Sequence, residues 1–335
     1  MAKIKIGING FGRIGRNVFK IANEKENIEV IGINDLTDTK TLAHLLKYDS
    51  TQGKFNGTVT YNDNNVIIDG REIRVTAERF PIDINWAETP DVVVEATGIF
   101  RMRESNNGGY GDHLKNGAKK VILTVPAKDE IDRMIVIGVN DNELQDEDEC
   151  VSNASCTTNC LAPVAKVLND RFGIENGLMT TVHAYTNDQC ILDAPHSDLR
   201  RARSAAVSQI PTTTGAAKAV GKIIPDLNGK LDGMAIRIPT PTGSLVDLVV
   251  NLKTEASKDE INAAMKEAAE GPMKGILEFQ EDPIVSVDII HNSHSSIYDK
   301  ESLMVQGKTV KILSWYDNEW GYSCRVVDLI DMFDL

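Results

Sequence analysis

The sequence predicts an α/β domain followed by an α+β domain with a mixed, mostly antiparallel sheet. Three observations indicate this division. Strand-like and helix-like patterns alternate through the first half, a glycine-rich turn joins its first strand to its first helix, and strand patterns dominate the second half. The 335 residues are enough for two domains of ordinary size.

Composition and charge argue against several classes of protein. The net charge of −13 argues against nucleic acid as a partner, because phosphate backbones require a basic surface. The five cysteines are too few and too scattered for a disulfide framework, and their spacing does not indicate a metal site. The N-terminus enters a strand pattern without an apolar signal segment, and no apolar run is long enough to span a membrane. We therefore expect a cytoplasmic protein without a membrane partner.

The first strand, Lys3–Asn9, runs into a glycine motif and then into an apolar-periodic helix that reaches Ala22. The motif is Gly10-Phe-Gly12-Arg13-Ile14-Gly15, and the strand, Gly-x-Gly-x-x-Gly and helix together form a dinucleotide-binding fingerprint. Asp35 follows the second strand, Glu29–Asn34, at the position that binds the adenosine ribose. This predicts a Rossmann-type domain, and an acid at that position favours NAD over NADP.

The remaining elements of the first half follow from local patterns. We expect a helix at Thr39–Tyr48, short antiparallel strands within Val59–Ala77, and buried strands at Asp91–Glu95, Lys120–Thr124 and Met134–Ile137. The glycine-rich segment Glu104–Asp112 interrupts the expected crossover helix, and we interpret it as a surface insertion.

The segment Ser152–Pro163 predicts a helix start, because small polar residues give way there to an apolar run. Ser155 or Thr157 can cap the helix. Cys156 then lies where unpaired N–H groups and the helix dipole favour a thiolate, although a buried packing role is as common for a free cysteine. His183, on the strand Leu178–Tyr185, is a base if it meets Cys156 in space.

The second half predicts further elements and a cluster of positive charge. Asp193–Val207 is a long ordered loop that carries Arg200, Arg201 and Arg203. The expected helices are Pro211 to Ile224, Ser257–Gly271 and Ser323–Phe333. The expected strands are Gly233–Thr240, Ser244–Leu252, Val285–Ile290 and Thr309–Trp315. Arg237 lies between two isoleucines in the first of these strands.

The chain resembles a phosphorylating glyceraldehyde-3-phosphate dehydrogenase nearly from end to end. The resemblance is carried by Ser152-Asn-Ala-Ser-Cys-Thr-Thr-Asn-Cys160, by the 27-residue step from Cys156 to His183, and by Tyr316–Tyr322. It implies that Cys156 attacks the aldehyde of D-glyceraldehyde 3-phosphate with His183 as base. Hydride transfer to NAD then gives a thioester, which inorganic phosphate cleaves to 1,3-bisphosphoglycerate in glycolysis or gluconeogenesis.

The resemblance also implies the remaining site residues and the domain boundaries. The residues expected to bind substrate or phosphate are Ser155, Thr157, Thr186, Asp188, Arg201, Thr214, Gly215 and Arg237. The residues expected to bind the cofactor are Gly10, Gly12, Arg13, Ile14, Gly15, Asp35, Arg79, Thr124 and Asn318. The NAD-binding domain would comprise 1–155 and 319–335, the catalytic domain would comprise 156–318, and the assembly would be a homotetramer.

One departure from the family pattern and three rival functions remain open. The 12 residues between Phe100 and His113 are about four more than we expect of the family. Erythrose 4-phosphate is an alternative substrate, and a non-phosphorylating reaction that ends in hydrolysis is an alternative outcome. A cysteine hydrolase built on Cys156 and His183 is the rival from another class, but it leaves the nucleotide fingerprint unexplained.

Overall fold

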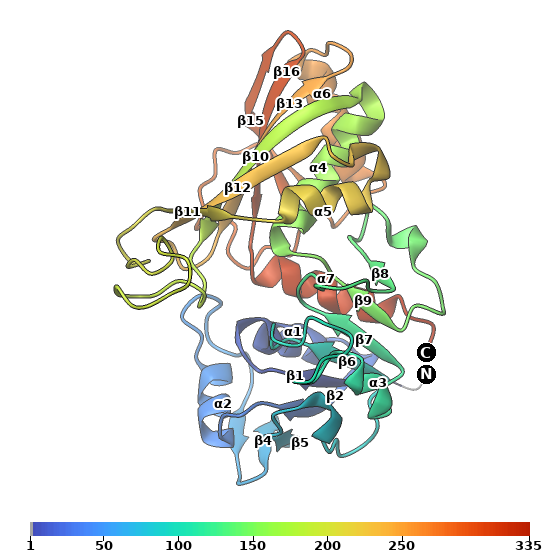
Figure 1. Cartoon of the computed structure of the whole chain (residues 1–335), viewed down its shortest axis with the longest axis vertical. Helices are drawn as coiled ribbons and strands as arrows, with labels where there is room; N and C mark the ends of the chain where they lie inside the picture. Colours follow the sequence, from blue (N-terminus) through green and yellow to red (C-terminus); the bar gives the residue numbers. More distant parts are fainter. Residues whose placement is uncertain (1–2) are drawn as a thin grey trace. The chain divides into compact units, whose positions relative to one another are not determined.

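The computed structural model describes residues 3–335, which form two compact units (Figure 1). Of the described residues, unit 1 consists of 3–135, Asn142–Ala154 and Ser323–Leu335, and unit 2 consists of Val136–Asp141 and Ser155–Tyr322. In the described part of the chain, no helix combines the length and the apolar character that are needed to cross a membrane.

Unit 1 is built on a nine-stranded sheet with the order β3-β4-β5-β2-β1-β6-β7-β9-β8. In this spatial order, neighbouring strands are parallel from β5 through β2, β1, β6, β7 and β9 to β8. At the other edge, β3, β4 and β5 form the antiparallel meander that the sequence predicts. The strands are β1 (Ile4–Asn9), β2 (Ile28–Asn34), β3 (Val59–Tyr61), β4 (Asn65–Ile68), β5 (Arg71–Thr76), β6 (Val92–Glu95), β7 (Lys120–Leu123), β8 (Arg133–Met134) and β9 (Cys150–Ser152). The helices are α1 (Arg13–Asn23), α2 (Thr39–Lys47), α3 (Asp112–Lys115) and α7 (Trp320–Asp331), and Pro81–Asp83 and Asp141–Glu143 are single 3₁₀ turns.

The three glycines between β1 and α1 have different physical roles. Gly10 has a φ of +92°, and a Cβ there would lie 2.7 Å from the Thr97 nitrogen. A Cβ on Gly15 would lie 2.0 Å from the Gly10 carbonyl oxygen. A Cβ on Gly12, in contrast, would meet no atom within 4 Å. Gly10 and Gly15 therefore serve the turn and its packing, and Gly12 leaves space for a ligand to approach the backbone.

A buried ion-pair cluster connects α1 to the segment after α2. Asp49 has a fully buried side chain and accepts hydrogen bonds from Arg13 Nη1 at 2.7 Å and from Lys20 Nζ at 3.0 Å. Burial raises the pKa of the Asp49 carboxyl. The hydrogen bonds from the Gln52 amide, Arg13 and Lys20 outweigh burial and hold that pKa well below its usual range.

Replacing Asp49 with asparagine is expected to destabilise unit 1 by about 3 kcal/mol at pH 7, because two cations lose their buried partner. A depressed carboxyl pKa stabilises the fold above the unfolded-state pKa of about 4, and this contribution is lost as the pH falls through the folded-state pKa. The Tm difference between the two proteins should therefore be full at pH 7 and shrink below about pH 4. Asp63→Asn, at an exposed turn, is the matched control. A Tm difference that does not change with pH would contradict the argument.

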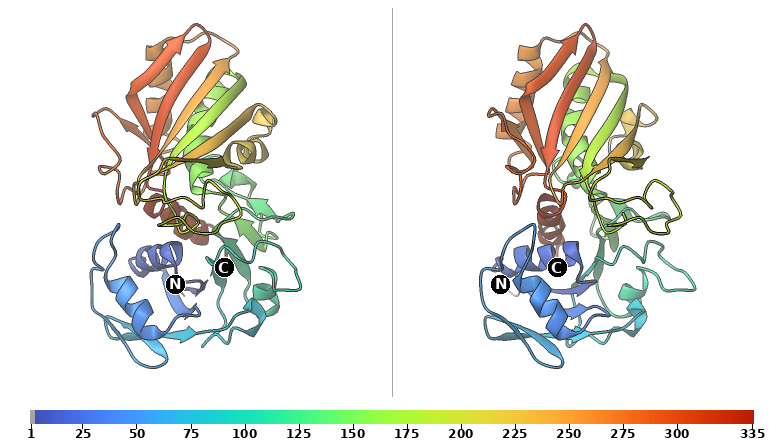
Figure 2. Two further views of the ribbon diagram at one scale, coloured as in Figure 1. Left: turned by 60° about the vertical axis from the view of Figure 1, so that its left-hand side comes forward. Right: turned by 90° about the vertical axis from the view of Figure 1, so that its left-hand side faces the viewer.

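Unit 2 is built on a seven-stranded mixed sheet with the order β11-β12-β10-β13-β16-β15-β14. Four of its six strand pairs are antiparallel, as the sequence predicts, and β10 with β12 and β14 with β15 are parallel. Helices α4, α5 and α6 pack on this sheet (Figure 2). The elements are α4 (Cys156–Phe172), β10 (Ile174–Ala184), β11 (Ile210–Thr213), α5 (Ala216–Ile223), the 3₁₀ turn Pro225–Leu227, β12 (Leu231–Ile238), β13 (Ser244–Leu252), α6 (Lys258–Glu270), β14 (Leu277–Gln280), β15 (Ser296–Gln306) and β16 (Thr309–Tyr316).

Local sequence explains where these helices begin. Ser155 is the N-cap of α4 and accepts a hydrogen bond from the Thr158 amide at 3.1 Å. Ser257 and Glu260 form a reciprocal capping box at the start of α6. The cap at Ser155 agrees with the sequence analysis, which left the choice between Ser155 and Thr157 open.

The structure corrects four expectations. The helix expected from Pro211 to Ile224 begins only at Ala216, because Ile210–Thr213 pairs with β12 as the strand β11. Val285–Ile290 is a series of turns rather than a strand, because the Asp288 side chain accepts from the Val285 amide and the two valines are more than half exposed. The strand expected at Met134–Ile137 is reduced to β8. The final helix begins at Trp320, three residues before the expected Ser323, because Asp317 accepts from the amides of Glu319 and Trp320 and starts it earlier.

The segment Glu104–Asp112 is a loop, as expected, but it is not simply a surface insertion. Tyr110 is fully buried and packs in a cluster with Val121, Leu123 and Cys150. The insertion is therefore anchored in the core of unit 1.

Candidate active site

Cys156 occupies the first helical position of α4, directly after the N-cap. Ala154, two residues before Cys156, has a φ of +54°, a strained value for a residue with a side chain. The Cys156 thiol is half-buried, and its Sγ lies 3.5 Å from His183 Nε2. The two residues that the sequence singled out, 27 positions apart, therefore meet in space.

His183 is oriented by the strand register and by a backbone carbonyl. It lies on β10 directly opposite Arg237 on the parallel strand β12. His183 Nδ1 is 2.7 Å from the Ala184 carbonyl oxygen, and Arg237 Nη1 is 2.6 Å from the same nitrogen and 3.0 Å from that oxygen. When the ring proton is on Nδ1, it is donated to Ala184, and Nε2 keeps the lone pair with which it can accept the proton of Cys156.

Burial and charge act on both members of the pair. Burial raises the pKa of the Cys156 thiol, and the positive charge of Arg237 opposes this shift. Burial, followed by the charge of Arg237, lowers the pKa of His183 to about 3. The imidazole is therefore neutral at physiological pH and available as a base, and the start of α4 and Arg237 both favour negative charge on the sulfur.

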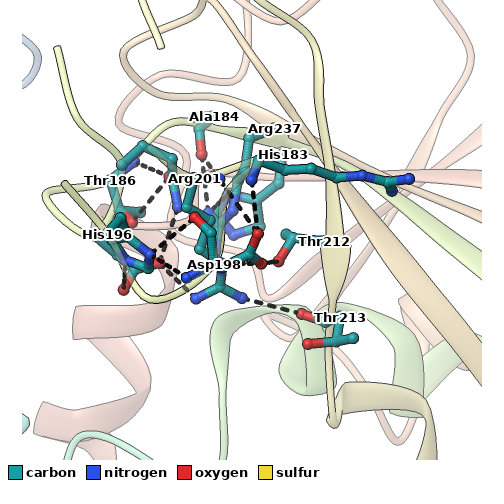
Figure 3. A network of polar contacts seen from close by, with 12 residues as sticks. His183, Ala184, Thr186, His196, Asp198, Arg201, Thr212, Thr213 and Arg237 are labelled. Carbon is teal, nitrogen blue, oxygen red and sulfur yellow. Dashed lines mark hydrogen bonds and ion pairs between the residues drawn. The ribbon is translucent and has the colours of Figure 1, made fainter. Parts of the chain in front are cut away.

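A second arginine, Arg201, lies in the long loop Asp193–Val207 and is hydrogen-bonded to polar groups that include residues of β11 (Figure 3). Arg201 Nε donates to Thr212 Oγ1 at 2.7 Å, and its Nη1 donates to Asp188 at 2.6 Å. Burial lowers the pKa of the Arg237 guanidinium, and the positive charge of Arg201 lowers it further to a smaller extent. Among the described residues, the buried Nε of Arg237 has no hydrogen-bond partner. The pair offers charged donors to an anion.

The structure places the other residues expected to bind phosphate in several environments. Thr186 bonds to Gln189, and Asp188 receives Arg201. Thr214 and Gly215 stand at the start of α5, where the Thr214 hydroxyl accepts from the Ala216 amide at 3.2 Å. Ser155 Oγ contacts Thr158 Oγ1 at 2.7 Å, in addition to its capping bond. The buried Thr157 hydroxyl contacts Tyr316 at 2.9 Å.

Tyr316 is a site residue that the sequence analysis did not single out. Its hydroxyl lies 2.9 Å from Thr157 and 2.8 Å from Thr181, and its ring meets the His183 ring edge-on with the centroids 5.8 Å apart. Tyr316 therefore holds the start of α4 and the His183 ring in place from β16. Its position in the Tyr316–Tyr322 motif was the only available signal.

Within unit 1, two glycines of the fingerprint, Gly10 and Gly12, line a cleft of about 520 Å³. Asp35 lies at the carboxyl end of β2 and accepts from the Phe11 amide at 2.8 Å and the Thr37 amide at 3.0 Å. The predicted residues Gly10, Gly12, Asp35 and Arg79 line this cleft, and Leu36, Phe80, Ile99 and Asn107 line it as well. Its place at the ends of parallel strands, together with the open space above Gly12, fits a dinucleotide.

The other expected cofactor residues do not line this cleft. Ile14 and Gly15 lie in the first turn of α1, and Arg13 binds Asp49 and Thr51. The Thr124 hydroxyl donates to the Glu95 carbonyl at 3.1 Å. Asn318 belongs to unit 2, where its side-chain oxygen accepts a hydrogen bond from the Ser244 hydroxyl. The same hydroxyl accepts a hydrogen bond from the amide of Ala184, the residue after His183.

Two family models match this chain. The NAD-binding domain of glyceraldehyde 3-phosphate dehydrogenase matches residues 4–103, and the C-terminal domain of the same enzyme matches residues 155–318. The chain belongs to the glyceraldehyde-3-phosphate dehydrogenase family. The resemblance inferred from the sequence, the Rossmann-type fold and NAD as the cofactor are thereby confirmed.

Curated relatives extend the match over the whole chain. A glyceraldehyde-3-phosphate dehydrogenase of Borreliella burgdorferi is 62% identical over 331 residues, which cover 97% of this chain and 98% of the relative. Glyceraldehyde-3-phosphate dehydrogenase of Geobacillus stearothermophilus is 58% identical over 329 residues, and glyceraldehyde-3-phosphate dehydrogenase 1 of Bacillus subtilis is 56% identical over 329 residues. In both cases 97% of this chain and 97% of the relative are covered. Both site regions therefore lie within the matched length.

Proposed function

We propose that this chain oxidises D-glyceraldehyde 3-phosphate with NAD and inorganic phosphate to 1,3-bisphosphoglycerate, NADH and a proton, as a step of glycolysis or gluconeogenesis. The observation that carries the proposal is the Cys156–His183 pair beside Arg237. A nucleophile and base alone fit many reactions. The half-buried Arg237 next to them, whose buried Nε has an unused donor, favours an anionic substrate. The family membership supports the same substrate.

The chemistry follows from the two side chains. Cys156 Sγ attacks the aldehyde carbon and gives up its proton to His183 Nε2. His183 passes this proton to the former carbonyl oxygen, which gives a thiohemiacetal with a hydroxyl group and leaves the imidazole neutral again. His183 then takes the hydroxyl proton of the thiohemiacetal as the C–H bond gives up its hydride, and a thioester on Cys156 remains. NAD, when bound, supplies the hydride acceptor. Attack by inorganic phosphate breaks the C–S bond and restores the Cys156 thiolate.

Two groups of residues are proposed to hold the two phosphates. Thr186, Asp188 and Arg237 are assigned to the phosphate of the substrate. Ser155, Thr157, Thr214 and Gly215 are assigned to the attacking phosphate, and Arg201 to the region that both share. The bonds from Arg201 to Thr212 and Asp188 support this region as a preorganised anion site.

The remaining expectations are proposals as well. Residues 1–155 and 319–335 are the NAD-binding domain, and 156–318 are the catalytic domain. The chain forms a homotetramer in the cytoplasm. Four large apolar residues of one loop, Ile191, Leu192, Leu199 and Val207, are each 74–81% exposed, which supports burial of this loop against another subunit. Five free cysteines fit a reducing compartment.

The phosphate requirement tests the proposal directly. With D-glyceraldehyde 3-phosphate and NAD but no inorganic phosphate, NADH should form as a burst of one equivalent per Cys156 and then nearly stop, because the thioester has no acceptor. Added phosphate should restore steady turnover. Absorbance at the NADH band in a stopped-flow instrument measures both phases.

Each rival function gives a different result in this assay. A steady rate that is indifferent to phosphate would contradict phosphorolysis and favour a reaction that ends in hydrolysis. A higher kcat/KM for erythrose 4-phosphate would reassign the substrate. Product formation without any NADH would favour a cysteine hydrolase.

A further inference from the structure

The inserted segment between Phe100 and His113 is held in a fixed position at its base. The Tyr110 hydroxyl donates to Asp129 at 2.9 Å, and the Arg103 guanidinium pairs with Asp132. The amides of Tyr110 and Gly111 donate to the carbonyls of Met102 and Arg103, each at 3.0 Å. These bonds and the burial of Tyr110 make the loop an ordered part of unit 1.

The tip of the insertion is a tight turn, Ser105–Gly108. The Gly108 amide donates to the Ser105 carbonyl at 3.1 Å, and the Ser105 hydroxyl donates back to the Gly108 carbonyl at 2.7 Å. Gly108 has a φ of +85°, and a Cβ on it would lie 3.1–3.4 Å from Phe100, Pro81 and Phe80. The tip therefore packs on the aromatic residues that form one side of the dinucleotide cleft.

This packing places Asn107 on the wall of the cleft that also contains Asp35. Its backbone amide donates to Ser105 Oγ. Within residues 3–335, its side-chain amide has no hydrogen-bond partner, so both its donor and its acceptor are available to a ligand. The neighbouring Asn106 is exposed but does not line the cleft. One residue of the insertion, and not its neighbour, thus borders the cofactor site.

We propose that Asn107 binds the adenosine end of the dinucleotide. Asp35, at the end of β2, defines where the adenosine ribose binds. Phe80 and Ile99 supply exposed apolar surface on the same cleft, which suits the face of a base. A carboxamide both donates and accepts hydrogen bonds, as the edge of adenine does. The insertion therefore contributes a binding contact for the cofactor, and the proposal holds whichever aldehyde is the substrate.

Binding measurements on Asn107→Ala test this assignment. Isothermal titration of the full chain with NAD should give a Kd about three- to tenfold higher than that of the wild type, the range expected for one lost hydrogen bond. ADP-ribose, which lacks the nicotinamide, should lose affinity by the same factor, because the contact lies at the adenosine end. Asn106→Ala, in the same turn, should bind both ligands as the wild type does.

Further measurements separate a lost contact from a disturbed loop. Neither asparagine has a positive φ, so alanine fits the backbone at both positions, and the Tm without NAD should be unchanged in both variants. An unchanged Kd for NAD in Asn107→Ala would overturn the proposal. It would also be overturned if ADP-ribose kept its full affinity, or if Asn106→Ala lost as much as Asn107→Ala.

Discussion

Replacing Cys156 with serine is expected to lower kcat for aldehyde oxidation by at least about 10⁴-fold. The alcohol is isosteric with the thiol, but its pKa is far above that of a cysteine, so neither the start of α4 nor Arg237 can hold it ionised. His183 would remain in place but would have no acidic proton to accept. The burst of NADH in the absence of phosphate, which reports thioester formation, should disappear in the same variant.

The cysteine one turn along the same helix provides the matched control. Cys160 is fully buried, its Sγ lies 3.5 Å from the Ser314 carbonyl oxygen, and burial raises the pKa of its thiol to about 12. Cys160→Ser should therefore keep most of the activity. Cys156→Ser should still bind NAD with the wild-type Kd, because the cofactor cleft belongs to unit 1. Loss of activity in Cys160→Ser alone would show that the nucleophile has been assigned to the wrong residue.

Replacing His183 with asparagine is expected to lower kcat by about 10²–10⁴-fold and to leave slow thioester formation. The pKa of about 3 makes the imidazole neutral and able to accept a proton throughout the neutral range, and asparagine cannot replace that function. The amplitude of the NADH burst should be retained while its rate falls, which single-turnover stopped-flow kinetics can resolve.

A control for the loss of a histidine is available on the surface. His44 is exposed on α2, so His44→Asn should have wild-type kinetics. If His183→Asn formed the thioester at the wild-type rate, His183 would be reduced to a residue that only positions Cys156. The Tm of the variant must also be measured, because His183 is buried and packs against Tyr316.

Most of the fold could be predicted because its patterns are local. The glycine motif, the cap at Ser155 and the capping box at Ser257 each occupy a few neighbouring residues. β15 was missed because Asp299, Lys300 and Glu301 interrupt its apolar pattern. Asp299 is nevertheless buried, since Trp315 Nε1 on β16 donates to it at 3.1 Å. The strand therefore depends on its pairing with β16 in an antiparallel hairpin rather than on an apolar pattern of its own.

The candidate site could be predicted only in part for the same reason. Cys156 and His183 were identified by residue type and by the resemblance. In contrast, the shared carbonyl of Ala184 and the contacts of Tyr316 depend on the register of strands that are distant in sequence. The position of Asn107 at the cleft follows from the burial of Tyr110, which a glycine-rich segment does not reveal.

The return of the C-terminal residues to unit 1 has a consequence for biosynthesis. Val326, Val327, Leu329 and Ile330 of α7 are completely buried, and residues from Ser323 onward belong to unit 1. A ribosome adds about 5–20 residues per second, so roughly 10–30 seconds separate the synthesis of Ala154 from that of Ser323. During that interval the nascent first unit lacks its last helix, and chaperones have a defined apolar surface to protect. Unit 2 is the part of the chain that can complete its fold first.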